Sequence, residues 1–426
     1  MTRDVKIFPA VLNGVVRAIP SKSQAHRALI CAALADKQTI IECEGGSDDI
    51  AATADCLSAL GAKIEREAGV YVVHPLKREA DGDAVTLPCG ESGSTFRFML
   101  PIAGALGRKA SFDLKGRLPQ RPLSPLYEEL VRHGAELSPQ GSVPFYCEGH
   151  LAPGRYSLDA GVSSQFISGL LFALPLLDGD SELQLTGQAE SFPYIELTLA
   201  MLEIFGIKTE FKNNIFSIPG GQTFRSPGKA RVEGDWSNAA FWMSAGAVGK
   251  GSITCAGLNL QSRQGDRAIL DVLAKFGARI KTEDSAVTVS GGKLRGIEID
   301  ARDIPDLVPV LAVVAAVAKG TTVIRNAARL RTKESDRLAA VSAVLRALGA
   351  DVNETEDGLV IRGGAALTGA CVSSCGDHRI AMSAAIAAAV CGQPVVIQGA
   401  QAVNKSYPGF FDDLRSLGGG VQDLNT

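Results

Sequence analysis

A glycine that recurs at a nearly constant interval constrains the fold of this chain more than any other feature. It ends six short phrases, and the intervals between them run from 69 to 73 residues. The six positions are Gly61, Gly134, Gly206, Gly277, Gly349 and Gly418. A fixed period indicates one structural unit that is copied along the chain, here about 71 residues long. The 426 residues therefore hold six copies of the unit.

The residues around each glycine predict a helix followed by a strand. Before Gly349, the residues Leu338, Val341 and Leu345 fall on one helical face. The glycine then follows the end of the helix, where a left-handed backbone costs a residue without Cβ little. An alternating segment comes next, for example 278–281 in the fourth copy, and alternation is typical of a strand with one wet face.

A second series of six positions, 69 to 74 residues apart, opens stretches rich in Ala, Gly and Leu. A helix that is apolar nearly all round is buried, so each unit is predicted to hold one buried helix, one surface helix and several strands, as βαβαββ. The buried helices should start at one end of each domain, where their N–H groups and dipoles attract anions. Alternatively, the opening residues are only N-caps. They are Ser23, Ser94, Ser163, Ser237, Asp306 and Asp377.

Length and composition further restrict the class of protein to which the chain can belong. A chain of 426 residues is expected to form two domains, with three units in each. A net charge of −3 argues against nucleic acid as a partner, and nine cysteines without a paired pattern indicate a reducing cytosol. The start is no signal peptide, and the longest apolar run, 307–318, is too short to span a bilayer. Cys371 and Cys375 lack a second ligand pair, so we expect no metal site.

Basic residues gather at the helix starts and in nearby loops. The guanidinium groups of Arg27, Arg97 and Arg379 fall inside predicted buried helices, where each needs a partner. Arginine suits planar contact with carboxylate or phosphate, so the substrate is predicted to carry more than one such group. No phosphate-binding P-loop, dinucleotide fingerprint or nucleophilic triad is present in the sequence. The candidates for acid–base work are Asp306, Glu334 and His378, although Asp306 could equally be an ordinary cap.

Several longer motifs resemble one known family. They run in order from about residue 6 to about residue 415, and the resemblance is to 5-enolpyruvylshikimate-3-phosphate (EPSP) synthase. The motifs are Ser21-Lys22-Ser23 with Arg27, Val162-Ser163-Ser164-Gln165-Phe166, Glu233-Gly234-Asp235, Lys333-Glu334-Ser335-Asp336-Arg337 and Asp377-His378-Arg379-Ile380-Ala381-Met382.

The resemblance implies an α/β fold of two inside-out α/β barrel domains, each made of three βαβαββ repeats. It also implies a discontinuous domain, 1–18 plus 228–426, a central domain, 19–227, and an active site in the cleft between them. No metal or organic cofactor is required. We expect a cytoplasmic monomer that works on small molecules, with neither nucleic acid nor membrane as a partner.

The reaction implied by the resemblance belongs to the shikimate pathway. The enolpyruvyl group of phosphoenolpyruvate moves to the 5-hydroxyl of shikimate 3-phosphate, and phosphate leaves. Asp306 would act as base and Glu334 as acid, with Lys22 as a third catalytic group. The residues implied to hold shikimate 3-phosphate are Lys22, Ser23, Arg27, Ser163, Ser164, Gln165, Ser191, Tyr194, Asp306 and Lys333. Those implied to hold phosphoenolpyruvate are Lys22, Gly93, Arg121, Gln165, Arg337, Arg379 and Lys405.

The chain departs from its relatives at three positions. Glu91 and Phe98 stand where many relatives carry asparagine and proline, which bears on phosphoenolpyruvate affinity and on inhibition by glyphosate. Arg329 stands where some relatives carry a substrate-binding asparagine. Two other functions remain open. The sister enzyme that acts on UDP-N-acetylglucosamine usually has a cysteine before its equivalent of Arg121, and the segment 116–120 has none. A non-catalytic anion-binding scaffold is the second.

Overall fold

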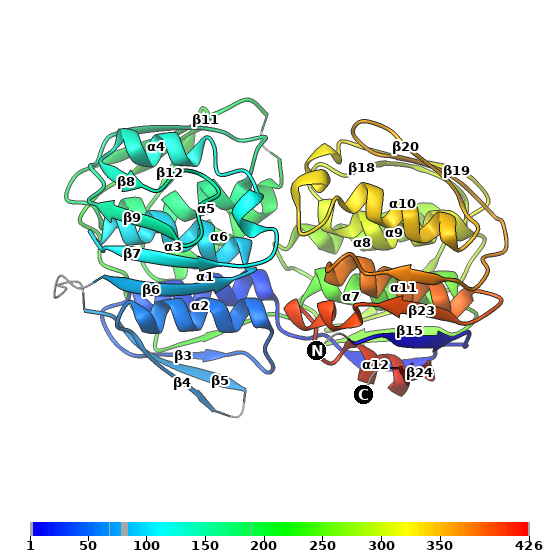
Figure 1. Cartoon of the computed structure of the whole chain (residues 1–426). Helices are drawn as coiled ribbons and strands as arrows, with labels where there is room; N and C mark the ends of the chain where they lie inside the picture. Colours follow the sequence, from blue (N-terminus) through cyan, green and yellow to red (C-terminus); the bar gives the residue numbers. More distant parts are fainter. Residues whose placement is uncertain (1–2, 68, 78–83, 189, 425–426) are drawn as a thin grey trace. The chain divides into compact units, whose positions relative to one another are not determined.

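The computed structural model of the chain describes residues 3–67, 69–77, 84–188 and 190–424 (Figure 1). The chain divides into two compact units. The terminal unit contains Met1–Ser21 and Glu233–Thr426, and the central unit contains Lys22–Val232. The chain thus passes from one unit to the other a few residues beyond the boundaries that the sequence indicated.

Within the described residues, six sheets of four strands repeat one topology. In each sheet the first and second strands of the repeat pair in parallel, and the remaining neighbours pair antiparallel. A parallel pair needs a long crossover, and a helix provides it. The predicted βαβαββ repeat is therefore confirmed.

Three of these sheets belong to the central unit. Their strands, in sheet order, are β14 (Lys229–Arg231), β3 (Thr39–Glu42), β5 (Val70–His74) and β4 (Lys63–Glu67); β6 (Val85–Gly90), β7 (Ala110–Leu114), β9 (Phe145–Gly149) and β8 (Ala135–Leu137); and β10 (Arg155–Asp159), β11 (Ser181–Thr186), β13 (Ile215–Ile218) and β12 (Glu210–Lys212). Its helices are α1 (Lys22–Ala33), α2 (Asp48–Ala59), α3 (Gly93–Ala105), α4 (Leu126–Arg132), α5 (Ser164–Ala173) and α6 (Phe192–Ile204), with 3-10 turns η1 (Leu118–Gln120) and η2 (Leu174–Leu176).

The terminal unit holds the other three sheets. Their strands, in sheet order, are β16 (Arg279–Glu283), β17 (Ala286–Ser290), β15 (Ser252–Ala256) and β2 (Gly14–Arg17); β18 (Glu298–Asp300), β19 (Gly320–Arg325), β21 (Leu359–Gly363) and β20 (Asp351–Glu354); and β22 (Cys371–Ser373), β23 (Val395–Gln398), β1 (Val5–Phe8) and β24 (Gly420–Asp423). Its helices are α7 (Trp236–Val248), α8 (Ile269–Phe276), α9 (Val308–Val317), α10 (Arg337–Ala347), α11 (His378–Val390) and α12 (Phe410–Ser416), with η3 (Gly265–Ala268), η4 (Pro305–Leu307), η5 (Ala328–Thr332) and η6 (Ala400–Lys405).

Two strands lie next to the points where the chain passes between the two units, and each pairs with a strand far away in sequence. Strand β2 precedes the central unit, yet Val15 pairs in parallel with Thr254 of β15. Strand β14 closes the central unit, and Ala230 pairs in parallel with Ile41 of β3. Both sheets therefore have four strands, although one strand of each is far in sequence from the other three.

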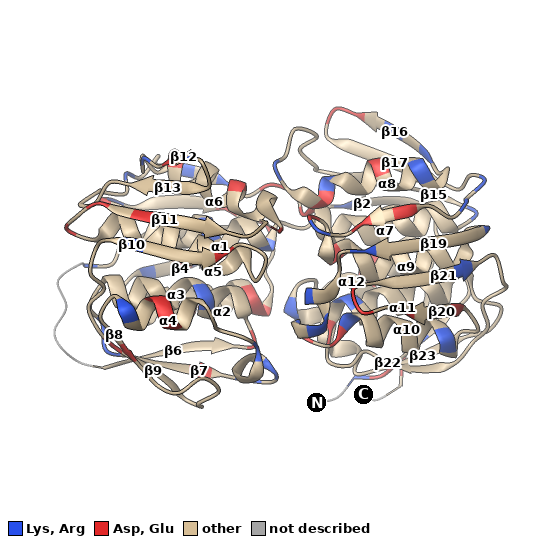
Figure 2. Cartoon of the chain, turned by 90° about the horizontal axis from the view of Figure 1, so that it is seen from above, with Lys and Arg blue, Asp and Glu red and all other residues tan. Residues whose placement is uncertain are grey.

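The first helix of each repeat lies in the interior of its unit, with the sheets outside it, whereas the second helix has an exposed face, as in α4 and α8. Helix α9 carries no charged residue, appears uniformly tan in Figure 2, and is buried almost along its whole length. The strands instead bury alternate residues, as Val395 and Ile397 of β23 show. Each unit has its own apolar core. This arrangement is the inside-out α/β barrel that the resemblance implied, and it confirms the predicted fold class.

The six periodic glycines follow their helices with positive φ, between +75° and +105°. At Gly134 a Cβ atom would also lie 2.7 Å from the carbonyl oxygen of His150. A residue with a side chain would be strained there both by its backbone and by this contact. The prediction that these glycines end the helices is confirmed.

The predicted N-caps are correct at only two of the six positions. Ser163 accepts a hydrogen bond from the backbone of α5, and Asp377 does so in α11. The caps of α3 and α7 are Ser92 and Asp235, because their extended backbone lets each side chain reach the amide three residues on. The other predicted caps, which lie within the first turns of α1, α3 and α7 or in η4, are Ser23, Ser94, Ser237 and Asp306.

Candidate functional site

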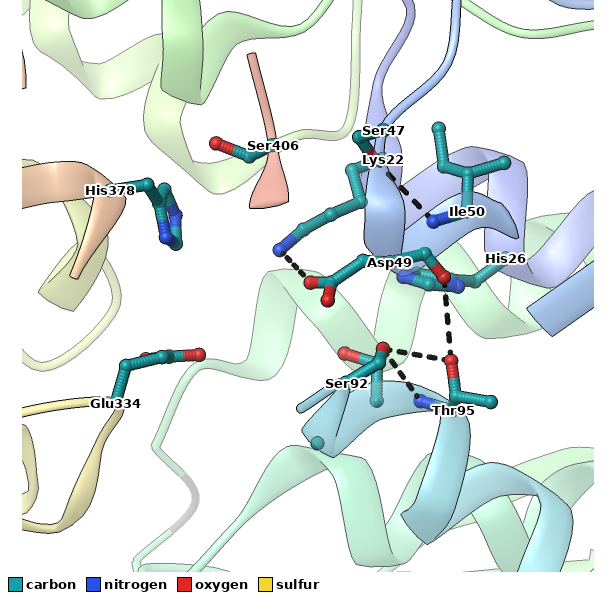
Figure 3. A network of polar contacts seen from close by, with 12 residues as sticks. Lys22, His26, Ser47, Asp49, Ile50, Ser92, Thr95, Glu334, His378 and Ser406 are labelled. Carbon is teal, nitrogen blue, oxygen red and sulfur yellow. Dashed lines mark hydrogen bonds and ion pairs between the residues drawn. The ribbon is translucent and has the colours of Figure 1, made fainter. Parts of the chain in front are cut away.

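The central unit places Lys22 at the start of α1, where it meets a carboxylate. Its Nζ donates to Oδ2 of Asp49 at 2.7 Å, and both side chains are mostly buried (Figure 3). Asp49 lies in the first turn of α2, whose cap is Ser47. Asp49 was not among the residues predicted from the sequence. Its signal was the Ser-Asp-Asp run ahead of an apolar helix, which is typical of a helix N-terminus.

Arg27 is buried and bound by neutral oxygen atoms. Its Nε donates to Oγ1 of Thr198 at 2.8 Å, Nη1 to the carbonyl of Ser23 at 2.6 Å, and Nη2 to the carbonyl of Tyr194 at 2.8 Å. Burial lowers the pKa of Arg27 to about 10, so the group keeps its charge at neutral pH. The structure thus brings two of the predicted acceptor-binding residues, Ser23 and Tyr194, into contact with a third, the cation of Arg27.

The start of α5 contains the predicted run of Ser163, Ser164 and Gln165. The amide of Gln165 donates from Nε2 to Oγ of Ser94 at 2.9 Å, which joins the first turns of α5 and α3. Ser191, ahead of α6, is buried and has φ of 54°, a left-handed conformation that a serine seldom adopts. Strained residues of this kind cluster at functional sites.

Gly93 allows two guanidinium groups to approach the start of α3. A Cβ atom at Gly93 would lie 2.6 Å from Nη1 of Arg121 and 2.7 Å from Nη1 of Arg97. Arg97 also donates to the carbonyl of Pro122 at 3.0 Å. Helix N-termini already favour anions, and the two cations add to that preference.

A buried chain of polar groups joins α1, α2 and α3. The ring Nδ1 of His26 lies 2.6 Å from Oγ1 of Thr53, and that oxygen lies 2.6 Å from Oγ1 of Thr95. Thr95 donates in turn to Oγ of Ser92 at 2.8 Å (Figure 3). Desolvation lowers the pKa of His26 to about 3, so its ring is neutral. No periodic signal indicated this chain, because its members lie on three different helices.

Arg337 is the centre of the charged cluster in the terminal unit. Its side chain is 2% exposed and donates to three carboxylates, each at 2.8 Å. Nη1 binds Asp306, Nη2 binds Glu334 and Nε binds Asp377. The two predicted acid–base residues therefore share one guanidinium group.

Arg379 holds the same aspartate from the first turn of α11. Its Nη2 donates to Oδ2 of Asp306 at 2.9 Å, and Nη1 to the backbone carbonyl of Asp306 at 3.1 Å. Burial alone would raise the pKa of Asp306, but the positive charges of Arg379 and Arg337, with Lys333, hold that pKa well below its ordinary value. The predicted base is thus a weak base as the structure stands.

Asp266, in η3, is a further carboxyl that sequence reasoning missed. It is 2% exposed, and burial together with the charge of Asp306 raises its pKa to about 7. Arg379 and Ser237 act in the opposite direction. A signal existed, because Gly265 and Asp266 repeat the Gly-Asp pair found at 234–235 and 376–377.

The remaining predicted residues of the terminal unit lie at the ends of its short turns and helices. Lys405 ends η6 and is buried, and Lys333 follows η5. His378 opens α11, with Nδ1 3.7 Å from Oδ1 of Asp377. Arg329 donates to the carbonyl of Arg302 at 2.6 Å.

Among the described residues, no group of three or more His, Cys, Asp or Glu could hold a metal ion. None of the helices described is both long and apolar enough to cross a membrane.

Comparison with known proteins places the chain in a class. The family described as EPSP synthase (3-phosphoshikimate 1-carboxyvinyltransferase) matches residues 8–414. A protein of Clostridium acetobutylicum named 3-phosphoshikimate 1-carboxyvinyltransferase is 46% identical over 424 residues, with 98% of each chain covered. One of the same name from Clostridium kluyveri is 43% identical over 433 residues, again with 98% of each covered. The solved EPSP synthase of Acinetobacter baumannii has a TM-score of 0.84 at 25% identity, covering 99% of this chain and 100% of its own.

Fold, site and relatives together define a transferase. More specifically, the chain belongs to the EPSP synthase (3-phosphoshikimate 1-carboxyvinyltransferase) family, and the resemblance stated from its motifs is confirmed.

Proposed function

We propose that this chain transfers the enolpyruvyl group of phosphoenolpyruvate to the 5-hydroxyl of shikimate 3-phosphate and releases inorganic phosphate. The observation that supports this most strongly is the position of Asp306 and Glu334. In a chain of this family, both carboxylates bind the one guanidinium group of Arg337. An addition–elimination reaction needs a base for the hydroxyl and an acid for the methylene carbon, and these two groups meet that need.

The acceptor is proposed to bind chiefly through the central unit. The cation of Arg27 and the N-terminus of α5 both favour an anionic phosphate. The residues proposed for shikimate 3-phosphate are Lys22, Ser23, Arg27, Ser163, Ser164, Gln165, Ser191, Tyr194, Asp306 and Lys333.

The donor is proposed to bind through cations of both units. Its carboxylate and phosphate match the bidentate geometry of arginine. The residues proposed for phosphoenolpyruvate are Lys22, Gly93, Arg121, Gln165, Arg337, Arg379 and Lys405.

The chemical steps follow from these roles. Asp306 takes the proton of the 5-hydroxyl as its oxygen attacks C2 of the donor, and Glu334 gives a proton to the methylene carbon. The tetrahedral adduct then loses phosphate, which takes the proton held by Asp306, and the methyl group returns a proton to Glu334 as the double bond re-forms. Lys22 and the arginines bring two mutually repelling anions together and stabilise the charge that develops.

Phosphate release tests the proposal. The enzyme is given phosphoenolpyruvate with shikimate 3-phosphate, and in parallel phosphoenolpyruvate with UDP-N-acetylglucosamine. Release with shikimate 3-phosphate alone supports it. Release with the nucleotide sugar alone would show the sister activity, and release with neither acceptor would favour the binding scaffold.

We also propose that the chain works as a cytoplasmic monomer and is inhibited by glyphosate, a compound with the carboxylate and phosphonate groups that the donor cations would accept. Light scattering of the purified protein tests the monomer. Glyphosate inhibition measured against Glu91→Asn tests whether that carboxylate, near the proposed donor residues, weakens inhibition.

A further inference from the structure

The arginines proposed for the donor already bind carboxylates of the terminal unit. Arg337 donates to Asp306, Glu334 and Asp377, and Arg379 donates to Asp306. An arriving carboxylate or phosphate that binds the Nη groups now directed at Asp306 would compete with this carboxylate for them. Donor binding therefore changes the partners of these carboxylates.

Of these carboxylates, Asp306 would lose the most hydrogen bonds to arginine in this exchange. Both of its carboxylate oxygens are engaged, Oδ1 by Arg337 and Oδ2 by Arg379, at 2.8 and 2.9 Å. A buried carboxylate without such partners strongly prefers to be protonated. Asp266 is buried as well, and the charges of both Asp306 and Arg379 shift its pKa.

We propose that the donor anion and Asp306 compete for Arg337 and Arg379, so that donor binding makes the buried pair Asp306 and Asp266 take up one shared proton from solvent. The inference rests on the proposed function, since it requires phosphoenolpyruvate to occupy these arginines. It assigns Asp266 as a positioning residue that acts through Asp306 and Arg379.

The charged groups around the pair favour this exchange. On the negative side are Glu334, which shares Arg337, and Asp235, the cap of α7, which adds its charge at Asp266. On the positive side Lys333 remains after the arginines are occupied. Asp377 keeps the Nε of Arg337 and the hydroxyl of Ser335, and His378 lies beside it. A single proton relieves the repulsion between two buried carboxylates whose charges interact.

The exchange would also serve the reaction. The bound proton enters as the donor arrives and leaves when phosphate departs and the ion pairs re-form, so the cycle is balanced. While the donor occupies the arginines, Asp306 is no longer held by them, and its proton affinity moves toward the range in which a carboxylate works as a base.

Isothermal titration calorimetry measures the proton directly. Phosphoenolpyruvate, without acceptor, is titrated into the full chain in buffers of different ionisation enthalpy, and the titration is repeated with inorganic phosphate. We expect an uptake of about half a proton or more per phosphoenolpyruvate at pH 7, rising from pH 6 to pH 8 as Asp266 ionises in the ligand-free protein. No uptake after correction for the anion's own protonation, or failure of both anions to bind, would overturn the inference.

Three variants locate the proton. Asp266→Asn and Asp306→Asn are each expected to reduce the uptake at least twofold. Asp423→Asn is the matched control, because Asp423 is likewise held by two arginines, Arg3 at 2.5 Å and Arg415 at 2.8 Å, but lies on β24. Uptake that persists in both cluster variants, or that falls equally in the control, contradicts the assignment.

Turnover of the same preparation separates the two proposals. Phosphate release without proton uptake would defeat only this inference, whereas proton uptake without turnover would defeat the proposed function. The pH dependence of the donor KM gives a second readout. The pH dependence of KM should become weaker in Asp266→Asn. If Asp266 had a purely structural role, the shape of this pH dependence would not change.

Discussion

The central and terminal units share one repeat and one sheet order, yet their helix starts carry different chemistry. In the central unit the buried cation Arg27 is bound by carbonyl and hydroxyl oxygens. In the terminal unit the buried cation Arg337 is bound by three carboxylates. The fold sets where functional groups can stand, and the residues at equivalent positions decide what each half can do.

The difference also separates two tasks. A guanidinium group held by neutral oxygens retains most of its attraction for an anion, as a binding site requires. One held by carboxylates is largely neutralised and instead controls the protonation of those carboxylates. The central unit is therefore suited to holding charge, and the terminal unit to moving protons.

The largest expected effect is on enzyme activity, and it tests whether the two units perform these two different tasks. Glu334→Gln removes the proposed acid but keeps a hydrogen-bond acceptor for Arg337, so kcat should fall by about 10² to 10⁴ with little change in KM. Ser163→Ala in the central unit should instead mainly raise the KM for shikimate 3-phosphate. Steady-state kinetics measure both, and a KM effect alone for Glu334→Gln would contradict the assignment of proton transfer to the terminal unit.

The next largest expected effect is on the free energy of unfolding, and it distinguishes the two buried arginines. Arg337→Ala leaves three carboxylates without their shared partner and should lower the free energy of unfolding by about 3–5 kcal/mol. Arg27→Ala leaves only neutral acceptors unsatisfied and should cost about 1–3 kcal/mol. Urea unfolding monitored by fluorescence checks the order. An equal loss in both variants would mean that the carboxylates are solvated rather than bound.

Mild acid should affect the central unit first. The pKa of His26 is lowered to about 3 in the folded chain, so unfolding binds a proton as soon as pH falls below the ordinary histidine value. The stability from its neutral ring is full above about pH 6.5 and should fall by about 2 kcal/mol at pH 5. The low pKa of Asp306 affects stability only below about pH 4, where an unfolded aspartate begins to protonate. Hydrogen exchange at pH 5 and 7 should show earlier loss in 22–232, and His26→Asn should remove the difference.

The smallest expected loss of stability is that of a simple helix cap, and it is compared with the loss at the equivalent cap of the other unit. Ser163→Ala removes the cap of α5 and should cost about 1 kcal/mol. Asp377→Ser keeps a capping hydroxyl on α11 but removes the carboxylate that binds Arg337, so its cost should be several times larger. Thermal unfolding of both variants gives the comparison, and similar losses would show that Asp377 acts only as a cap.

Local signals predicted the fold well and the site only in part. The glycine period and the apolar helices depend on neighbouring residues, and the structure confirms them. The caps Ser92 and Asp235 were misjudged because two polar residues lie close together and only the backbone conformation selects one. The partners of Arg337 and Arg379 come from positions up to 73 residues away, so no local pattern could pair them. Asp49 and Asp266 each had a local signal, the Ser-Asp-Asp run and the repeated Gly-Asp pair, but their charged partners lie on other elements of the fold.

The strand pairing near the chain ends bears on how the protein is made. Val5 of β1 pairs with Ile397 of β23 and with Asp423 of β24. Synthesis proceeds from the N-terminus, so the first strand must wait for almost the whole chain before either neighbour exists. The central unit receives its last strand, β14, much earlier. We expect the nascent chain to carry a completed central barrel while its leading strands are still exposed edges, which is the stage most prone to wrong pairing.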